Sequence, residues 1–163
     1  DAMLRALAAE KNRGRSISTM GVIAANVDRG VLAPADAVRW AVGLVKMHYV
    51  NVPISVATLN AAIEAAIPLQ DYATLIENLT RESSDKQSIV IVTAAHLVGS
   101  LAASAVWELA RTYFETCVRA VGRRIGFAAL RQIMDTFIAR APILPANAFR
   151  LRELIEEVAS VQM

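Results

Sequence analysis

Cysteine and charge are both scarce in this chain of 163 residues. Only Cys117 is a cysteine, which excludes an intrachain disulfide framework and any zinc site built from several cysteines. Charged residues make up 20% of the chain, against about 25% in a typical domain. Mean hydropathy is +0.41, so the composition argues against a disordered chain, a solvating tail and a polybasic chain.

Histidine is equally sparse. The only two histidines, His48 and His96, each lack a second metal ligand four residues away on a helix. A mononuclear zinc site needs three or four ligands, so these two residues and Cys117 would have to converge through tertiary structure. We therefore predict no metal site and no cofactor, and we interpret His96 as a hydrogen-bonded histidine of the core or of an interface.

Motifs that carry catalysis are missing or isolated. The segment 83–86 is a literal S-x-x-K motif at the start of an apolar helix, the type found in penicillin-recognising enzymes. Its companion motifs, Lys-Thr-Gly and Ser-Asp-Asn, do not occur, and the glycines are too scattered for a phosphate-binding loop. We interpret the motif as a capping loop and predict a protein that is not an enzyme and has no small-molecule substrate.

Apolar residues are abundant and recur at helical spacing. They make up 55% of the chain, or about 58% when Gly replaces Tyr in the set, against about 45–50% in typical domains. The spacing predicts an all-α fold with a single domain of about seven to nine helices. Residues 1–17 are expected to form an N-terminal helical arm and a break, and residues 18–163 the globular domain. Helices are predicted over 2–11, 18–29, 34–49, 56–66, 69–80, 85–107, 107–121, 127–140 and 148–161.

Local signals set the expected helix ends. Gly30 suits a left-handed C-terminal residue, Pro34 a first helical turn and Ser55 an N-cap. Ser84, with Gln87 three residues on, forms a capping box that predicts a helix start at residue 85. Two further signals concern the C-terminal half: Gly122 and Gly126 predict a break around Arg123 and Arg124, and Asn147 is expected to cap the last helix.

The segment 87–107 is the most unusual part of the sequence, because it holds 21 residues without a formal charge. Its β-branched run 89–92 is compatible with a buried strand, but the apolar pattern continues far beyond strand length, which favours a helix. Ala95, Gly99 and Ala103 recur every fourth residue, a pattern that lets helices approach closely. We predict a buried central helix around which the others pack, with an intersubunit helix and a membrane segment as alternatives. Membrane insertion is disfavoured by the polar residues within the segment.

Arginine dominates the positive charge. The net charge is +2, but residues 107–152 carry an excess of basic residues, and the acidic tail contains Glu153, Glu156 and Glu157. A ladder of Glu108, Arg111, Glu115 and Arg119 has the three- and four-residue spacing of helical ion pairs. The candidate residues for binding a polyanion or a neighbouring subunit are Arg13, Arg15, Arg119, Arg123, Arg124 and Arg131.

The function expected from these features is non-enzymatic self-assembly. The high apolar content and the uncharged segment predict a homo-oligomeric structural or interaction protein, of the coat, shell or scaffold type. The alternative is a helical nucleic-acid-binding subunit that uses the arginine-rich region 107–131. No signal-peptide pattern is seen at the start. A cytoplasmic or virion-like assembly is favoured, although the sequence does not identify the compartment.

Overall fold

The computed structural model describes residues 19–49, 52–81, 84–102 and 107–161, and these residues form helices and no strand. The all-α prediction is therefore confirmed, and the eight helices of this part of the chain fall within the expected number. They are α2 (Thr19–Asp28), α3 (Pro34–Lys46), α4 (Val56–Glu64), α5 (Leu69–Leu79), α6 (Lys86–Ala102), α7 (Trp107–Ile125), α8 (Phe127–Ile138) and α9 (Pro145–Ser160).

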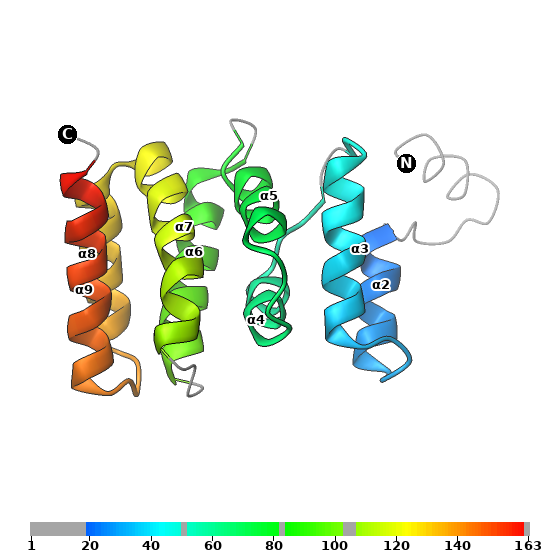
Figure 1. Cartoon of the computed structure of the whole chain (residues 1–163), viewed down its shortest axis with the longest axis horizontal. Coiled ribbons are helices and arrows are strands. Elements are labelled where there is room, and N and C mark those ends of the chain that lie inside the picture. The colour runs from blue at the N-terminus through cyan, green and yellow to red at the C-terminus, as the bar shows by residue number, and fades with distance from the viewer. Residues whose placement is uncertain (1–18, 50–51, 82–83, 103–106, 162–163) are drawn as a thin grey trace.

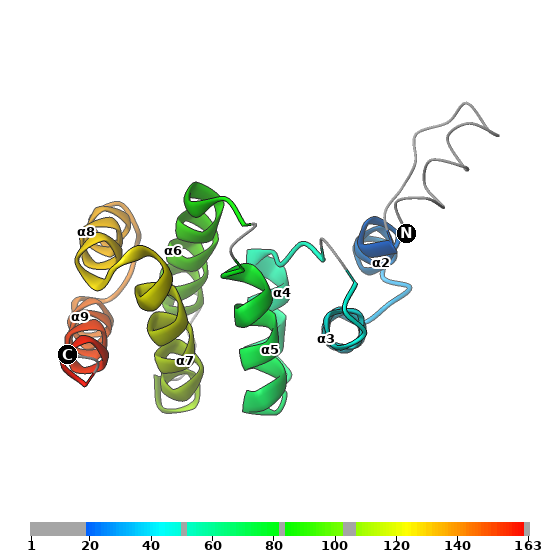
Figure 2. The same cartoon turned by 90° about the horizontal axis from the view of Figure 1, so that it is seen from above.

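The helices stack as a line of four hairpins, α2/α3, α4/α5, α6/α7 and α8/α9 (Figures 1 and 2). Within this line α4, α6 and α8 pack side by side, and α3, α5, α7 and α9 do the same. Seen from above, the even-numbered helices form one row and the odd-numbered helices the other (Figure 2). This architecture is that of an α-solenoid, in which each hairpin buries its apolar face against its neighbours.

The core lies between the two rows. Both rows contribute side chains that are fully buried, among them Leu59, Leu97 and Leu130 from the even row and Leu75, Phe114 and Leu151 from the odd row. Burying a side chain of this size contributes roughly 1.5–3 kcal/mol. The helix–helix interface between the rows is therefore the main source of stability.

Several predicted helix signals are confirmed. Pro34 begins α3, the Ser55 hydroxyl oxygen accepts a hydrogen bond from the Thr58 amide at 3.1 Å, and Gly30 has a φ of 70°. His48 and Ala66, which sequence reasoning did not single out, also have positive φ values, of 58° and 46°. The amide of His48 donates to Val45 and that of Tyr49 to Leu44, which is the hydrogen-bond pattern of a Schellman motif. This motif ends α3 at Lys46, before the predicted end at residue 49.

Other predicted boundaries are wrong. Asp85 caps α6 in place of Ser84, because its carboxylate accepts hydrogen bonds from the Ser88 amide at 2.8 Å and the Ser88 hydroxyl at 3.0 Å. Gly122 does not break the chain, and α7 continues to Ile125. Pro145 starts α9, so Asn147 lies in the first turn and is not the cap.

The uncharged segment 87–107 spans more than one helix. The structure ends α6 at Ala102 and begins α7 at Trp107, and the two helices pack against each other. The run 89–92 lies within α6, so the helical interpretation is confirmed and the strand alternative is wrong. α6 packs against α4, α7 and α8 but leaves Ile91 exposed on its outer side. It occupies an inner place in its row, and a central helix surrounded by the others stays an unverified prediction.

Among the helices that the structure describes, none has both the length and the apolar character needed to cross a lipid bilayer.

Candidate functional site

A cluster of buried polar side chains lies between α4, α5 and α6. The Tyr72 hydroxyl lies 2.8 Å from His96 Nε2, and His96 Nδ1 lies 2.6 Å from the Asn60 side-chain oxygen. The Ser100 hydroxyl donates to the same oxygen at 3.0 Å. Because this amide oxygen only accepts, Nδ1 carries the imidazole proton, and the Tyr72 hydroxyl donates to Nε2. The prediction that His96 is a hydrogen-bonded core residue is confirmed.

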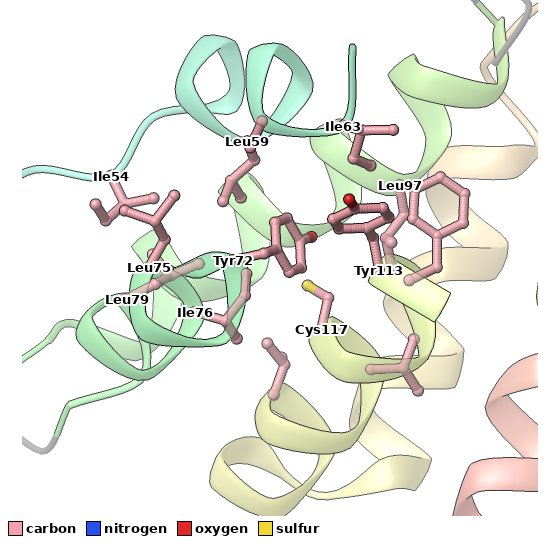
Figure 3. Packing of buried hydrophobic residues seen from close by; sticks show 14 of the residues in the cluster. Ile54, Leu59, Ile63, Tyr72, Leu75, Ile76, Leu79, Leu97, Tyr113 and Cys117 are labelled. Carbon is pink, nitrogen blue, oxygen red and sulfur yellow. The ribbon is translucent and has the colours of Figure 1, made fainter. Parts of the chain in front are cut away.

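Burial controls the ionisation of this cluster and of Cys117 on α7, which lies beside it. It lowers the pKa of His96 to about 3 and raises the pKa of Cys117 to about 12. It also raises the pKa of Tyr72 well above its usual value. Figure 3 shows the Cys117 thiol next to the Tyr72 ring in the apolar core, with Tyr113 beside them. At neutral pH the imidazole is therefore neutral and the thiol protonated, and the arrangement holds three helices in register.

The structure does not bring the candidate metal ligands together. His48 is exposed beyond the end of α3, whereas His96 and Cys117 are buried. Within the described residues no group of three or more His, Cys, Asp or Glu side chains could hold a metal ion.

The candidate arginines of the C-terminal half lie among carboxylates. Arg119 pairs with Glu115 on the same helix, as the ladder predicts, and Arg131 of α8 lies 2.8 Å from Glu156 of α9. Arg123 is exposed and Arg124 is partly buried, both near the end of α7. Arg13 and Arg15 lie outside the described residues.

Further ion pairs join the last three helices. Arg111 of α7 contacts the Glu157 carboxylate at 3.0 Å, and Arg152 of α9 contacts Asp135 of α8 at 2.7 Å. Glu156 and Glu157 of the acidic tail thus pair with arginines of the same chain. The basic block and the acidic tail offset each other at this end of the molecule.

Charge is distributed unequally between the two rows. In the even row, α2, α4 and α6 carry a single charged residue each, Asp28, Glu64 and Lys86, and α8 carries Arg131 and Asp135. In the odd row, α7 alone carries Glu108, Arg111, Glu115, Arg119, Arg123 and Arg124. The even row is therefore poor in charge from α2 to α6, whereas the odd row carries many charged residues, several of them ion-paired.

The small residues of α6 lie on the outer side of the even row. Ala95 and Gly99 are half-buried and follow Ile91, which is 49% exposed, at four-residue spacing. A methyl group added at Gly99 would meet no atom within 4 Å, so no described helix packs closely on this position. Ala103, the third predicted residue of this pattern, lies outside the described residues.

Grooves of similar size lie between neighbouring hairpins of the described part of the chain. One, of about 350 Å³, lies between α2, α3 and α4 and is lined mainly by apolar side chains. Another, of about 310 Å³, lies between α5 and α7 and includes Glu77, Glu115, Arg119 and Arg123. A third, of about 330 Å³, lies between the segment before α4, the end of α5 and the start of α6. Sequence reasoning missed these grooves, because each depends on how neighbouring hairpins sit beside one another.

Comparison with protein-family models, with curated proteins and with solved structures finds no match for this chain.

Proposed function

We propose that this chain is a non-enzymatic α-helical interaction protein that assembles with copies of itself, as a subunit of the coat, shell or scaffold type. The observation that carries the proposal is the difference in charge between the two rows. Charged residues are depleted where protein surfaces are buried in assemblies and abundant where they face water. The outer side of α2, α4 and α6 has the composition of the first kind of surface.

The exposed apolar residues of the even row support the same proposal. Val22 of α2 and Ile91 of α6 are 48% and 49% exposed, and each lies on a helix with a single charged residue. The odd row also exposes large apolar side chains, Trp40, Leu69, Leu109 and Phe149, but its helices carry two to six charged residues each. Single exposed apolar residues are normal on a monomer, so Val22 and Ile91 support the proposal only together with the scarcity of charge on their helices. A solenoid also presents an extended face to a protein partner. The expected partner is a second copy of this chain.

A matched pair of variants tests the proposal. Ile91 on the even row and Leu109 on the odd row are 49% and 51% exposed, so a glutamate costs the monomer about the same at each position. If the even row is the interface, Ile91→Glu weakens self-association at least about tenfold, because a carboxylate is then buried without a partner. Leu109→Glu leaves self-association unchanged.

Sedimentation velocity across a dilution series measures the self-association of both variants. Absorbance at 260 and 280 nm, recorded on the same boundary, shows whether nucleic acid sediments with the protein. Circular dichroism melting of both variants checks that the fold is intact. A strictly monomeric wild-type chain at micromolar concentration and moderate salt would contradict the proposal. Equal weakening by the two variants would contradict the choice of surface.

The alternative, a nucleic-acid-binding subunit, remains a prediction from the sequence. It receives less support than self-assembly, because Arg119 and Arg131 already pair with carboxylates. Its test is the double variant Arg123→Ala/Arg124→Ala. If both arginines bind phosphates, the salt dependence of oligonucleotide binding flattens by about two on the log–log plot. Tight, salt-dependent binding that this variant loses, with the oligomer size unchanged, would replace self-assembly by nucleic-acid binding as the main function.

A further inference from the structure

The apolar groove of about 350 Å³ separates α2 from α4, two neighbouring helices of the even row. α4 packs on α3, α5, α6 and α7, whereas α2 packs mainly on α3. Ile23 and Val27 of α2 form one wall, Ala61 of α4 forms the other, and Val38 of α3 lies at the base. Elsewhere in this row, α4, α6 and α8 lie side by side. The groove is thus an opening in an otherwise continuous row of helices.

Both charged residues that line this groove are acidic. Asp28 stands at the end of α2 and Glu64 at the end of α4, and the remaining lining residues are apolar or uncharged. The groove therefore favours an occupant with one apolar face and a net positive charge.

The N-terminal segment of the chain has these properties. The sequence predicts an amphipathic helix over 2–11 with Met3, Leu4 and Leu7 on one face. Across residues 1–15 the basic residues Arg5, Lys11, Arg13 and Arg15 outnumber the acidic residues Asp1 and Glu10.

The length of the groove also agrees with that of the helix predicted over 2–11. α2 has 10 residues and α4 has 9, so at 1.5 Å per residue the walls of the groove are about 14–15 Å long. A helix over 2–11 has the same length. The groove can therefore take this segment along its whole extent, with the basic residues that follow it close to Asp28 or Glu64.

We propose that this groove is the docking site for the N-terminal segment, residues 1–18, of a second copy of the chain. This inference rests on the proposed self-assembly and names the contact that mediates it. α4 belongs both to a wall of the groove and to the uncharged outer side of the even row, so a copy that covers this side lies next to the groove. An exchanged terminal segment of this kind joins identical subunits with no further partner.

A charge-swap experiment on the full-length chain tests the inference. One variant reverses the groove, Asp28→Lys/Glu64→Lys, and the other reverses the segment, Arg13→Glu/Arg15→Glu. Each variant alone is expected to self-associate about tenfold or more weakly than the wild type, because each places like charges opposite one another. A 1:1 mixture of the two is expected to regain association, since the reversed segment of one copy then meets the reversed groove of the other.

The control variant Glu77→Lys/Glu108→Lys reverses two exposed carboxylates of the odd row and is expected to associate as the wild type does. Sedimentation velocity at low and moderate salt provides the readout, and circular dichroism confirms folding. If the wild type associates and both swap variants associate equally well, self-assembly stands and the docking site is wrong. If the 1:1 mixture does not regain association but a single chain that carries both the reversed groove and the reversed segment does, the segment covers its own groove. Exchange between copies is then wrong. A monomeric wild type overturns both proposals.

Discussion

Alanine at Gly122 is expected to destabilise the protein, although alanine usually favours a helix. A Cβ atom built on Gly122 lies 2.2, 2.5 and 2.6 Å from three ring atoms of Phe127. Ordinary contacts to a Cβ atom begin near 3.4 Å, so the ring must move by about 1 Å. Phe127 is partly buried against the core at the start of α8, and its displacement opens the joint between α7 and α8.

The expected magnitude follows from two opposing effects. Replacing a helical glycine by alanine stabilises a helix by up to about 1 kcal/mol. Forcing a packed ring out of place costs about 1–3 kcal/mol. With the full helix gain, the net effect of Gly122→Ala is a loss of up to about 2 kcal/mol, equivalent to a fall in Tm of up to roughly 8 °C for a chain of this size.

Gly43 supplies the matched control. Like Gly122, it lies three residues before the last residue of its helix, but an added Cβ meets nothing within 4 Å. Gly43→Ala is therefore expected to stabilise the protein by about 0.5–1 kcal/mol. Urea titration followed by circular dichroism measures both changes. Equal stabilisation by the two substitutions would refute the reasoning, and Phe127→Leu should reduce the cost of Gly122→Ala, because leucine leaves more room for the added methyl group.

Three further changes test other parts of the fold. Ala66→Gly should stabilise the protein by about 0.5–1 kcal/mol in urea titration, because Ala66 has a φ of 46° and is exposed, whereas Ala65→Gly, at a φ of −80°, should destabilise it by a similar amount. Asp85→Ala should cost about 1 kcal/mol in the same assay, since it removes the cap of α6, and a loss below 0.3 kcal/mol would contradict this role. The pKa of His96 is lowered to about 3 in the folded state, so as the pH falls the imidazole is protonated in the unfolded chain before it is protonated in the folded one. Stability should fall by about 2 kcal/mol between pH 7 and pH 5, and His96→Gln should remove most of that slope; an unchanged slope would show that other groups cause it.

Local signals made much of the fold predictable. Pro34 and Ser55 act through their own backbone or side chain within one helical turn, so neither needs tertiary information. The break predicted between Gly122 and Gly126 falls at Gly126, which has a φ of 93°. It does not fall at Gly122, where Phe127 of the next helix packs in the space that a side chain would need. Ala66 likewise gives no sign in the sequence that it adopts a left-handed conformation, which is usually taken by glycine.

The candidate site divides in the same way. The burial of His96 could be predicted from its uncharged surroundings, but its contact with Tyr72 could not, since the two residues lie on different hairpins. The pairing of Arg131 with Glu156 depends on the register between α8 and α9. The groove depends on the spacing between α2 and α4, which no local pattern encodes.

Packing between neighbouring hairpins makes resistance to local opening uneven along the molecule. α7 packs against α4, α5, α6, α8 and α9, so releasing it disrupts most of the core, whereas α2 packs mainly on α3. In a linear array the free energy of opening is the sum of the contacts between adjacent units. The α2 end can therefore detach and rejoin while the rest stays folded, and amide hydrogens should exchange with solvent faster in α2 than in α7.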